Sequence, residues 1–410
     1  MSLSHTSDAD DYTGDYVKRV RETLEPFHSQ FPVWEKEGHL PARFFAAVGK
    51  AGLLRERWRE GPAGGHPLAR ALVAELAPLN AGAALALSIH SEVFTHALAR
   101  FGGETHQDLL EGALAGRVIG CFAATEHVGG SDLPGLQASA VRSGDGWHLR
   151  AEKRYITNAG RATHVLVLAK TDASRRGPCL FCVPLDRPGV TVRGFFETLG
   201  VRSADTTALS IDTVLEPTDI VGRPGAGLLM TLTLLDFERL AAAAALVAGA
   251  ESALKLAAAW ARRRKQFGAR LFDHQALRHR LADRWAEVYA ARAALEDTCR
   301  RLGEPALPHA QIAASKLLAA RAASSTTDDT LQILGARGYT TAFPAERMYR
   351  DVRLTRIGGG TDEMMREIIS ASLDTADPEA AALLDLYEAA DIPAEPGPRS
   401  AADSDAQRTS

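Results

Sequence analysis

The stretch Leu234-Leu235-Asp236-Phe237-Glu238-Arg239-Leu240 opens a long alanine-rich run that continues to about Phe267 and has the pattern of a helix. Glu238 has apolar neighbours one turn away on both sides, namely Leu234, Leu235, Ala241 and Ala242. A carboxylate on such a face is desolvated, which raises its pKa toward the range where a general base works. Glu238 is therefore a candidate base. The alternative is a carboxylate that pairs with a cation or reaches solvent from the helix edge.

The composition is that of a globular protein with room for two or three domains: 410 residues, 46% hydrophobic and 24% charged. A formal net charge of −4 gives no basic footprint for nucleic acid, and the dense cationic run at residues 262–265 is short. Residues 1–12 are acidic and polar, which predicts no secretory signal, and the longest apolar run, residues 240–250, is about half a membrane span. We expect a cytoplasmic protein that binds neither nucleic acid nor membrane.

Cysteine and histidine spacing predicts no metal site. Cys179 and Cys182 form a lone Cys-x-x-Cys with no second pair, so we interpret them as two small residues on a strand. Ser88, His90 and His96 lie on a small-residue helix predicted for residues 81–101, where a histidine is more often part of the core than a ligand.

Changes in sequence texture divide the chain into four parts and predict a multi-layer α+β fold. Residues 1–117 have helical periodicity, broken once at residues 61–67, and predict an N-terminal all-α domain. Residues 118–226 consist of short apolar runs separated by Gly, Asp and Asn, which predict a central antiparallel β sandwich or barrel. Residues 227–375 are helical again and predict a C-terminal four-helix bundle, whereas residues 376–410 predict a disordered tail.

Within these parts the individual elements can be placed. Strands are expected at residues 120–124, 138–142, 147–151, 164–170, 179–184, 190–193 and 208–214. The bundle helices are expected at residues 228–267, 274–302, 308–335 and 343–372.

Several short motifs carry residues that chemistry could use. Residues 124–132 follow a strand and supply two glycines flanked by hydroxyls, so that successive backbone N–H groups are open to a ligand. Residues 155–160 place an aromatic ring and a hydroxyl at the end of a second strand. The remaining motifs are residues 264–268 with 274–275, residues 332–339, and residues 350–353 leading into 357–363. Each is weak alone, since a Gly-Gly-Ser-Asp turn is usually only a turn.

Together, in this order and across a chain of helices, strands and helices, these motifs resemble the acyl-CoA dehydrogenase family over about residues 15–375. The resemblance implies FAD as the cofactor, bound between a β domain and a helical bundle. It therefore explains why the chain has no G-x-G-x-x-G fingerprint.

The resemblance also implies roles for individual residues in FAD binding. Residues matching those along the flavin ring and its turn are Phe122, Ala124, Thr125, Gly130 and Ser131, the last of which also meets the acyl chain. Tyr155 and Thr157 match the aromatic and hydroxyl groups that cover the ring near N5. The residues that match contacts to the FAD of a neighbouring subunit are Arg264, Gln266, Phe267 and Gln275. Those that match the pyrophosphate and final loop contacts are Gln332, Gly335, Thr361 and Glu363.

If two chains complete each FAD site, the protein is a dimer, usually doubled to a homotetramer. An acyl thioester substrate and an electron-transfer flavoprotein or similar acceptor are further implied partners.

The sequence departs from the family pattern at two places. Ala336 and Arg337 replace a paired glycine, which affects contacts to adenosine. Gly359 stands where the commonest members carry the catalytic glutamate. A minority branch, which includes isovaleryl and long-chain enzymes, carries its glutamate on the helix directly before an arginine, and Glu238-Arg239 stands at that place. The resemblance thus favours Glu238 as the base.

The implied reaction is α,β-dehydrogenation of an acyl thioester carried by coenzyme A or an acyl-carrier protein. Glu238 would take the α-proton, flavin N5 would accept the β-hydride, and the backbone N–H of Gly359 would help to stabilise the enolate. Asp236, Arg239 and Ser131 are the expected substrate contacts. The alternatives are a flavin-dependent oxidase or monooxygenase on the same fold, or a non-catalytic relative; the retained glutamate argues against both.

Overall fold

The computed structural model describes residues 8–171, 177–305 and 308–374, with residues 381 and 384. The chain up to Ile369 forms one unit and residues 370–410 form another. Apart from the two isolated residues, the predicted disordered tail at residues 376–410 lies outside the described part of the chain, and its disorder stays a prediction.

The N-terminal part is helical, as predicted, but it breaks more often than the sequence suggested. Its elements are α1 Asp8–Leu24, α2 Phe31–Glu37, α3 Ala42–Lys50, α4 Leu53–Trp58, α5 Gly61–Gly64, α6 His66–Leu76, α7 Ala81–Ser88, η2 Ile89–Thr95, α8 His96–Phe101 and α9 Gln107–Leu114. The helix predicted for residues 81–101 is present, although η2 within it is a π-helix. The π-helix brings His90 into the core, where its ring bonds Ala113 O and the N–H of Gly120.

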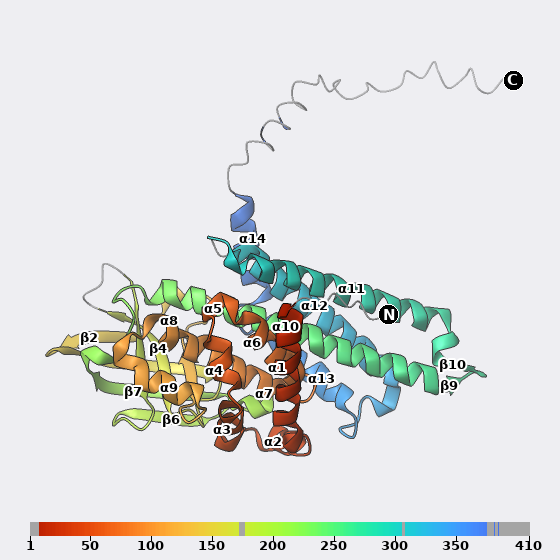
Figure 1. The fold of residues 1–410 in the computed structure, drawn as a ribbon, viewed down its shortest axis with the longest axis horizontal. Coiled ribbons are helices and arrows are strands. Elements are labelled where there is room, and N and C mark those ends of the chain that lie inside the picture. The colour runs from red at the N-terminus through yellow and green to blue at the C-terminus, as the bar shows by residue number, and fades with distance from the viewer. Residues whose placement is uncertain (1–7, 172–176, 306–307, 375–380, 382–383, 385–410) are drawn as a thin grey trace. The chain divides into compact units, whose positions relative to one another are not determined.

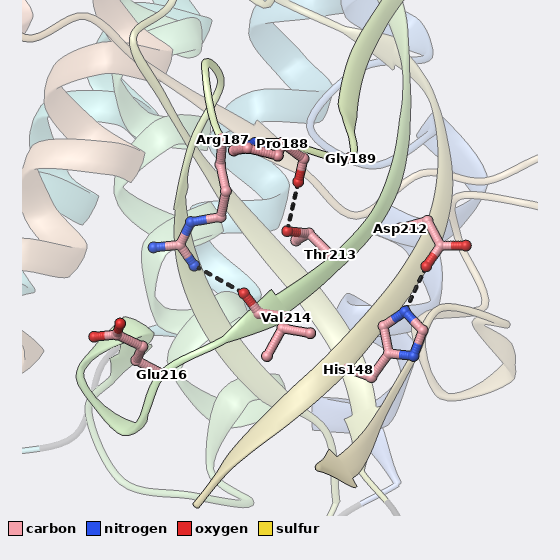
Figure 2. A pocket seen from close by; sticks show the side chains of 8 residues that line it. All are labelled: His148, Arg187, Pro188, Gly189, Asp212, Thr213, Val214 and Glu216. Carbon is pink, nitrogen blue, oxygen red and sulfur yellow. Dashed lines mark hydrogen bonds and ion pairs between the residues drawn. The ribbon is translucent and has the colours of Figure 1, made fainter. Parts of the chain in front are cut away.

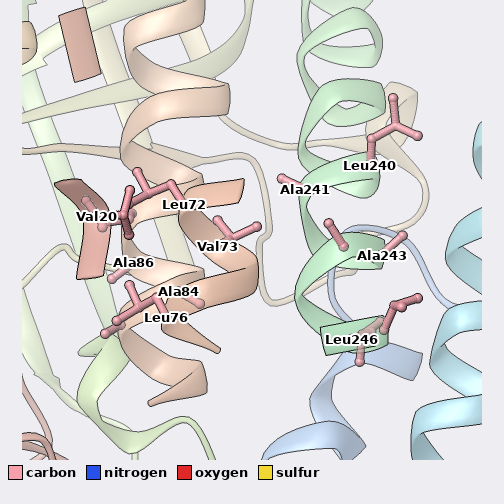
Figure 3. Close-up of a cluster of buried hydrophobic side chains, with 14 of the residues drawn as sticks. Val20, Leu72, Val73, Leu76, Ala84, Ala86, Leu240, Ala241, Ala243 and Leu246 are labelled. Carbon is pink, nitrogen blue, oxygen red and sulfur yellow. The ribbon is translucent and has the colours of Figure 1, made fainter. Parts of the chain in front are cut away.

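A shared hydrophobic core joins these helices to the bundle. Figure 3 shows Val20 of α1, Leu72, Val73 and Leu76 of α6, and Ala84 and Ala86 of α7 on one side. Leu240, Ala241, Ala243 and Leu246 of α10 (Gly227–Arg263) belong to the same buried cluster. Small side chains on α10 allow close approach of these helices, so the helix that carries Glu238 is held rigidly.

The central part is an eight-stranded sheet in the order β6-β7-β3-β2-β4-β5-β8, with β1 beside β4. The strands are β1 Gly120–Ala123, β2 Ser139–Ser143, β3 Gly146–Ile156, β4 His164–Thr171, β5 Cys179–Pro184, β6 Val190–Phe195, β7 Thr207–Leu215 and β8 Ile220–Val221. All seven predicted strands are confirmed; the two-residue β8 was missed because it is too short to show a pattern.

The sheet is not antiparallel throughout, which corrects one detail of the sequence prediction. β1 pairs parallel to β4, with Gly120 opposite His164, and β2 also runs parallel to β4 over a short stretch. The β2–β3 hairpin lies between β1 and β4 in the chain and provides the crossover that a parallel pair needs. Alternation of side chains predicts strands but not the direction of their neighbours.

The C-terminal part contains α10, α11 Gln275–Arg300, α12 His309–Leu334, α13 Pro344–Arg353 and α14 Asp362–Leu373, and α10, α11 and α12 run side by side (Figure 1). Two predicted helices were too long. α10 ends at Arg263, because Phe267 and Gly268 adopt positive φ and turn a short hairpin between β9 Lys265–Gln266 and β10 Ala269–Arg270. The segment predicted at residues 343–372 is interrupted by three consecutive glycines, residues 358–360.

α10 is long and apolar enough, by length and composition, to cross a membrane. Half of its most apolar stretch is buried against the rest of the protein, as in the core helix of a bundle. The predicted cytoplasmic location stays a prediction.

Candidate active site

Glu238 is buried on α10, with 4% of its surface exposed. Burial raises the pKa of its carboxyl group, and the positive charges of Lys316 and then Arg239 oppose that rise. Its Oε2 atom has no hydrogen-bond partner among the described residues. The predicted desolvation is thus confirmed, and a buried carboxylate with a free oxygen is equipped to accept a proton.

The carboxylate of Glu238 faces Gly359 in the glycine loop, residues 358–360, and occupies the space that a side chain at position 359 would need. A Cβ atom on Gly359 would lie 2.7 Å from Glu238 Oε2, and Gly359 has φ of +66°. The glycine therefore has two reasons to be there: its backbone conformation disfavours other residues, and the carboxylate fills the space of its side chain. The structure brings Glu238 and Gly359 together although they are 121 positions apart in the sequence.

Arg239 and Asp236 hold this arrangement from the same helix. Arg239 donates from Nε to the Gly359 carbonyl at 2.8 Å and from its terminal nitrogen to Asp236 at 2.8 Å. The other oxygen of Asp236 pairs with His309 at 2.5 Å. Because Asp236 and Arg239 are buried and already paired, these contacts support the loop; direct substrate contact by either stays a prediction.

Lys316 on α12 is a site residue that the sequence reasoning missed. Its ammonium donates to the carbonyl of Gly360 at 2.6 Å, next to the carbonyl that Arg239 holds. A signal was present, since Lys316 interrupts a run of small and apolar residues at positions 312–320 on a predicted helix. A charge in such a run is rarely buried without a partner.

In the β domain, the first motif lies against the end of β3, the strand that leads into the second motif. The N–H of Arg154 donates to Thr125 O, and the ammonium of Lys153 donates to Ala124 O. Gly130 lies close to Thr125, so that a Cβ at Gly130 would be 3.1 Å from the Thr125 side chain. Phe122 and Thr157 are half-buried, and Ser131 is exposed.

A buried ion pair between Lys153 and Glu126 supports this turn. Lys153 bonds Glu126 at 2.8 Å and also the carbonyl of Leu168. Glu126 accepts the N–H groups of Gln137 and Ala138, so one carboxylate ties both ends of residues 126–138. Burial alone would raise the pKa of Glu126, but these hydrogen bonds hold it below its ordinary value.

The residues assigned to the flavin ring fit an aromatic ligand. Tyr155 adopts φ of +59°, packs in a tilted arrangement on Phe196 with ring centroids 4.6 Å apart, and still keeps 57% of its surface exposed. Gly129 and Gly130 are exposed, although the N–H of Gly129 donates to the carbonyl of Glu126 within the turn. An accessible aromatic ring is a surface that a planar ring system could cover.

Most of the remaining predicted contacts lie at the far end of α10 from Glu238. Glu238 is roughly 37 Å from the end of α10 at 1.5 Å per residue. The hairpin after α10 carries Arg264, Gln266 and Phe267, and Phe267 is 96% exposed. Gln332 and Gly335 share this end, since Ile333 packs with Ala257 and Ala261. Gln275 is exposed at the start of α11. Thr361, which caps α14, and the exposed Glu363 are different, because they directly follow the glycine that Lys316 holds. Within one chain, the predicted contacts at the hairpin end are therefore remote from Glu238, whereas Thr361 and Glu363 are not.

A surface hollow of about 590 Å³ lies on the β domain, away from the predicted residues (Figure 2). His148, Arg187, Asp212 and Glu216 are among the residues that line it, and His148 bonds Asp212 across it. None of the predicted site residues lines this hollow.

Within the part of the chain that the structure describes, no group of His, Cys, Asp and Glu side chains is arranged to hold a metal ion. Cys179 and Cys182 are buried on β5, as expected for small strand residues. His96 packs against Phe237 at 4.8 Å and is part of the core.

Comparisons with known proteins show which family this chain is similar to. The acyl-CoA dehydrogenase N-terminal domain matches residues 15–117, the middle domain matches residues 121–214, and the C-terminal domain matches residues 225–373. The mitochondrial short-chain specific acyl-CoA dehydrogenase of Bos taurus is 33% identical over 367 residues, which are 86% of this chain and 89% of that protein.

Solved structures give the same result. Butyryl-CoA dehydrogenase from Megasphaera elsdenii superposes with a TM-score of 0.84 at 26% identity, covering 91% of this chain and 100% of that one. A glutaryl-CoA dehydrogenase from Mycobacterium smegmatis in complex with FADH2 has a TM-score of 0.82 at 25% identity, covering 88% and 94%. The chain therefore belongs to the acyl-CoA dehydrogenase family, whose members are FAD-dependent oxidoreductases that act on CH–CH bonds.

Proposed function

We propose that this protein removes an α-proton and a β-hydride from an acyl thioester, with Glu238 as the base. The observation that carries this proposal is the free Oε2 atom of Glu238, buried against Gly359. The raised pKa of Glu238 brings its basicity closer to that of a weakly acidic α-carbon, and the exclusion of water strengthens its interaction with the proton. This assignment places the protein in the branch whose glutamate is on the helix.

The glycine loop would stabilise the negative charge that the proton transfer leaves on the substrate. A thioester that loses its α-proton develops negative charge on the carbonyl oxygen, which needs donors already in place. The backbone N–H of Gly359 is the candidate donor, and a glycine suffices because only the backbone is used. Residues 122–131 and Tyr155 would hold FAD, which would supply the acceptor for the β-hydride. Electrons would leave through an electron-transfer flavoprotein or a similar acceptor.

A panel of thioesters tests the proposal. The purified protein should be yellow from bound FAD, and under anaerobic conditions one or more acyl-CoA or acyl-carrier thioesters should bleach the flavin absorbance within seconds. The panel reads out both the acyl group and its carrier. A protein that binds FAD but is reduced by no thioester would contradict the proposal, and rapid reoxidation by oxygen would favour the oxidase alternative.

We further infer that a second copy of the chain completes each FAD site. The hairpin with Arg264, Gln266 and Phe267 projects from the bundle end and is remote from Glu238 of its own chain. Trp285 and Tyr289 stack at 5.2 Å on the outward side of α11, with more than half of each ring exposed. Exposed aromatic surface of this kind is typical of an interface. A dimer, or a homotetramer made of two dimers, would cover it.

Replacing Arg264 by Ala should weaken FAD retention by roughly ten- to hundredfold, because a hydrogen bond to a charged group contributes about 1.5–3 kcal/mol. The ratio of flavin to protein absorbance after dialysis measures the loss, and light scattering measures the assembly. Arg262→Ala, an exposed arginine at the end of the same helix, is the matched control. Full FAD retention by an isolated monomer would show that no second chain is needed.

A further inference from the structure

Lys316 is a buried cation that the reaction described above does not use. It is 1% exposed, and burial lowers the pKa of its ammonium, an effect that the charges of Glu238 and then Asp362 oppose. Burying an ammonium is costly unless it is paired and hydrogen-bonded. Its position beside the glycine loop therefore calls for an explanation in terms of what the lysine holds.

The loop that Lys316 contacts would otherwise be the most flexible part of the site. Three consecutive glycines, residues 358–360, have no side chains to restrict them, and Gly359 and Gly360 adopt φ of +66° and +99°. Two cations from two different helices hold consecutive carbonyls: Arg239 of α10 holds that of Gly359 and Lys316 of α12 holds that of Gly360. Together they fix the chain just after the Gly359 N–H.

Two buried carboxylates near Lys316 each leave one oxygen without a partner among the described residues, Glu238 and Asp362. Asp362 on α14 is paired through its other oxygen with Arg356, and the exposed Glu363 bonds Arg366. On α10, Arg239 is already paired with Asp236, which also bonds His309. Glu238 faces Gly359, next to the glycine that Lys316 holds, and Lys316 comes first among the charges that oppose its desolvation.

We propose that Lys316 is a positioning residue for the dehydrogenation: it fixes the glycine loop through the Gly360 carbonyl and places its positive charge on the loop that the Glu238 carboxylate faces. This inference rests on the proposed role of Glu238. The physical reason is specific to a base on the helix. Moving the carboxylate from the loop to α10 leaves glycine at position 359, so a loop weakened by three glycines needs an external clamp.

The first test compares Lys316→Met with Lys316→Arg, and with Lys255→Met as a control for loss of one positive charge. Lys255 is exposed on α10, roughly 25 Å along the helix from Glu238. Stopped-flow flavin reduction is measured against pH in the FAD-loaded enzymes. Lys316→Met should keep FAD, reduce roughly ten- to hundredfold more slowly, and shift the acid limb of the rate profile to higher pH, because Glu238 becomes harder to ionise.

Lys316→Arg should restore the position of the acid limb, and Lys255→Met should leave it unmoved. An acid limb that stays in place in Lys316→Met, or one that Lys316→Arg fails to restore, would show that the lysine serves the fold alone and would overturn the proposal.

The second test does not depend on turnover. Thermal unfolding at pH 8 is measured for the FAD-loaded wild type, Glu238→Gln, Lys316→Met and the double variant. Without the lysine, the buried carboxylate of Glu238 loses a nearby positive charge. Glu238→Gln should therefore recover part of the stability that Lys316→Met loses, so that the stability changes of the two substitutions are not additive. Additive stability changes would show that Lys316 and Glu238 do not interact, and would overturn the proposal. If no thioester reduced the wild type, the proposed function would fail, while this cycle would still decide the role of Lys316.

Discussion

Glu238→Gln should slow flavin reduction by the active thioester by roughly two to four orders of magnitude, the range for loss of a positioned base. The substitution keeps size and polarity but removes the proton acceptor. FAD binding should persist, because Oε2 of Glu238 makes no hydrogen bond in the described part of the chain. Rapid mixing under anaerobic conditions gives the rate, and flavin absorbance gives the FAD content.

Glu251→Gln is the matched control for this prediction. Glu251 lies 13 residues further along α10, and its carboxylate pairs with Arg292 rather than with the glycine loop. The control should reduce at the wild-type rate. Equal rates for wild type and Glu238→Gln would return Glu238 to the alternative of a buried helix carboxylate, and an oxygen-activating reaction would become the leading hypothesis.

The same geometry defines how the base could be moved to the loop. A side chain at position 359 would meet the carboxylate of Glu238, since a Cβ there lies 2.7 Å from Oε2. Glu238→Ala combined with Gly359→Glu removes that clash and should recover part of the lost rate. Recovery should fall short of the wild type by about a hundredfold, because the φ of Gly359 disfavours a side chain and an error near 1 Å is enough for such a loss. A double variant no faster than Glu238→Ala would show that the two positions do not reach the same carbon.

Lys153→Met should destabilise the protein by about 3–5 kcal/mol, the loss expected when one partner of a buried ion pair is removed. Glu126 would be left buried with its two backbone partners alone, and Ala124 O would lose its donor. Because Glu126 ties both ends of residues 126–138, the turn beside the flavin should loosen and FAD should dissociate more readily. Thermal unfolding and FAD content after dialysis measure the two effects.

Lys170→Met is the matched control on β4, the next strand along the chain, where the lysine is exposed. An exposed surface substitution of this kind should change stability by about 0.5 kcal/mol or less. If Lys153→Met were as stable as this control, the buried pair would not support the turn, and the flavin contacts assigned to residues 122–131 would have to depend on the backbone alone.

Much of the fold followed from the sequence, because its information is local. Short apolar runs separated by turn residues predicted the seven longer strands. Helical periodicity predicted three of the bundle helices within a few residues, whereas residues 343–372 were predicted as one helix and form two. The predictions of where helices stop were wrong at places that backbone conformation decides. Phe267 and Gly268 turn a hairpin after α10, and Gly358 to Gly360 interrupt the last predicted helix. A side-chain pattern does not report which residues adopt positive φ.

For the site, the sequence alone determined that Glu238 sits on an apolar helix face, and its motif order placed the chain in a flavoprotein family. Only the tertiary structure decided what surrounds that carboxylate. In the folded chain, Gly359 lies beside Glu238 although 121 positions separate them in the sequence. Arg239 bonds the Gly359 carbonyl, and the buried Lys316 bonds the Gly360 carbonyl. These contacts join three separate segments, and the spacing of residues within one helix carries no information about which loop packs against it.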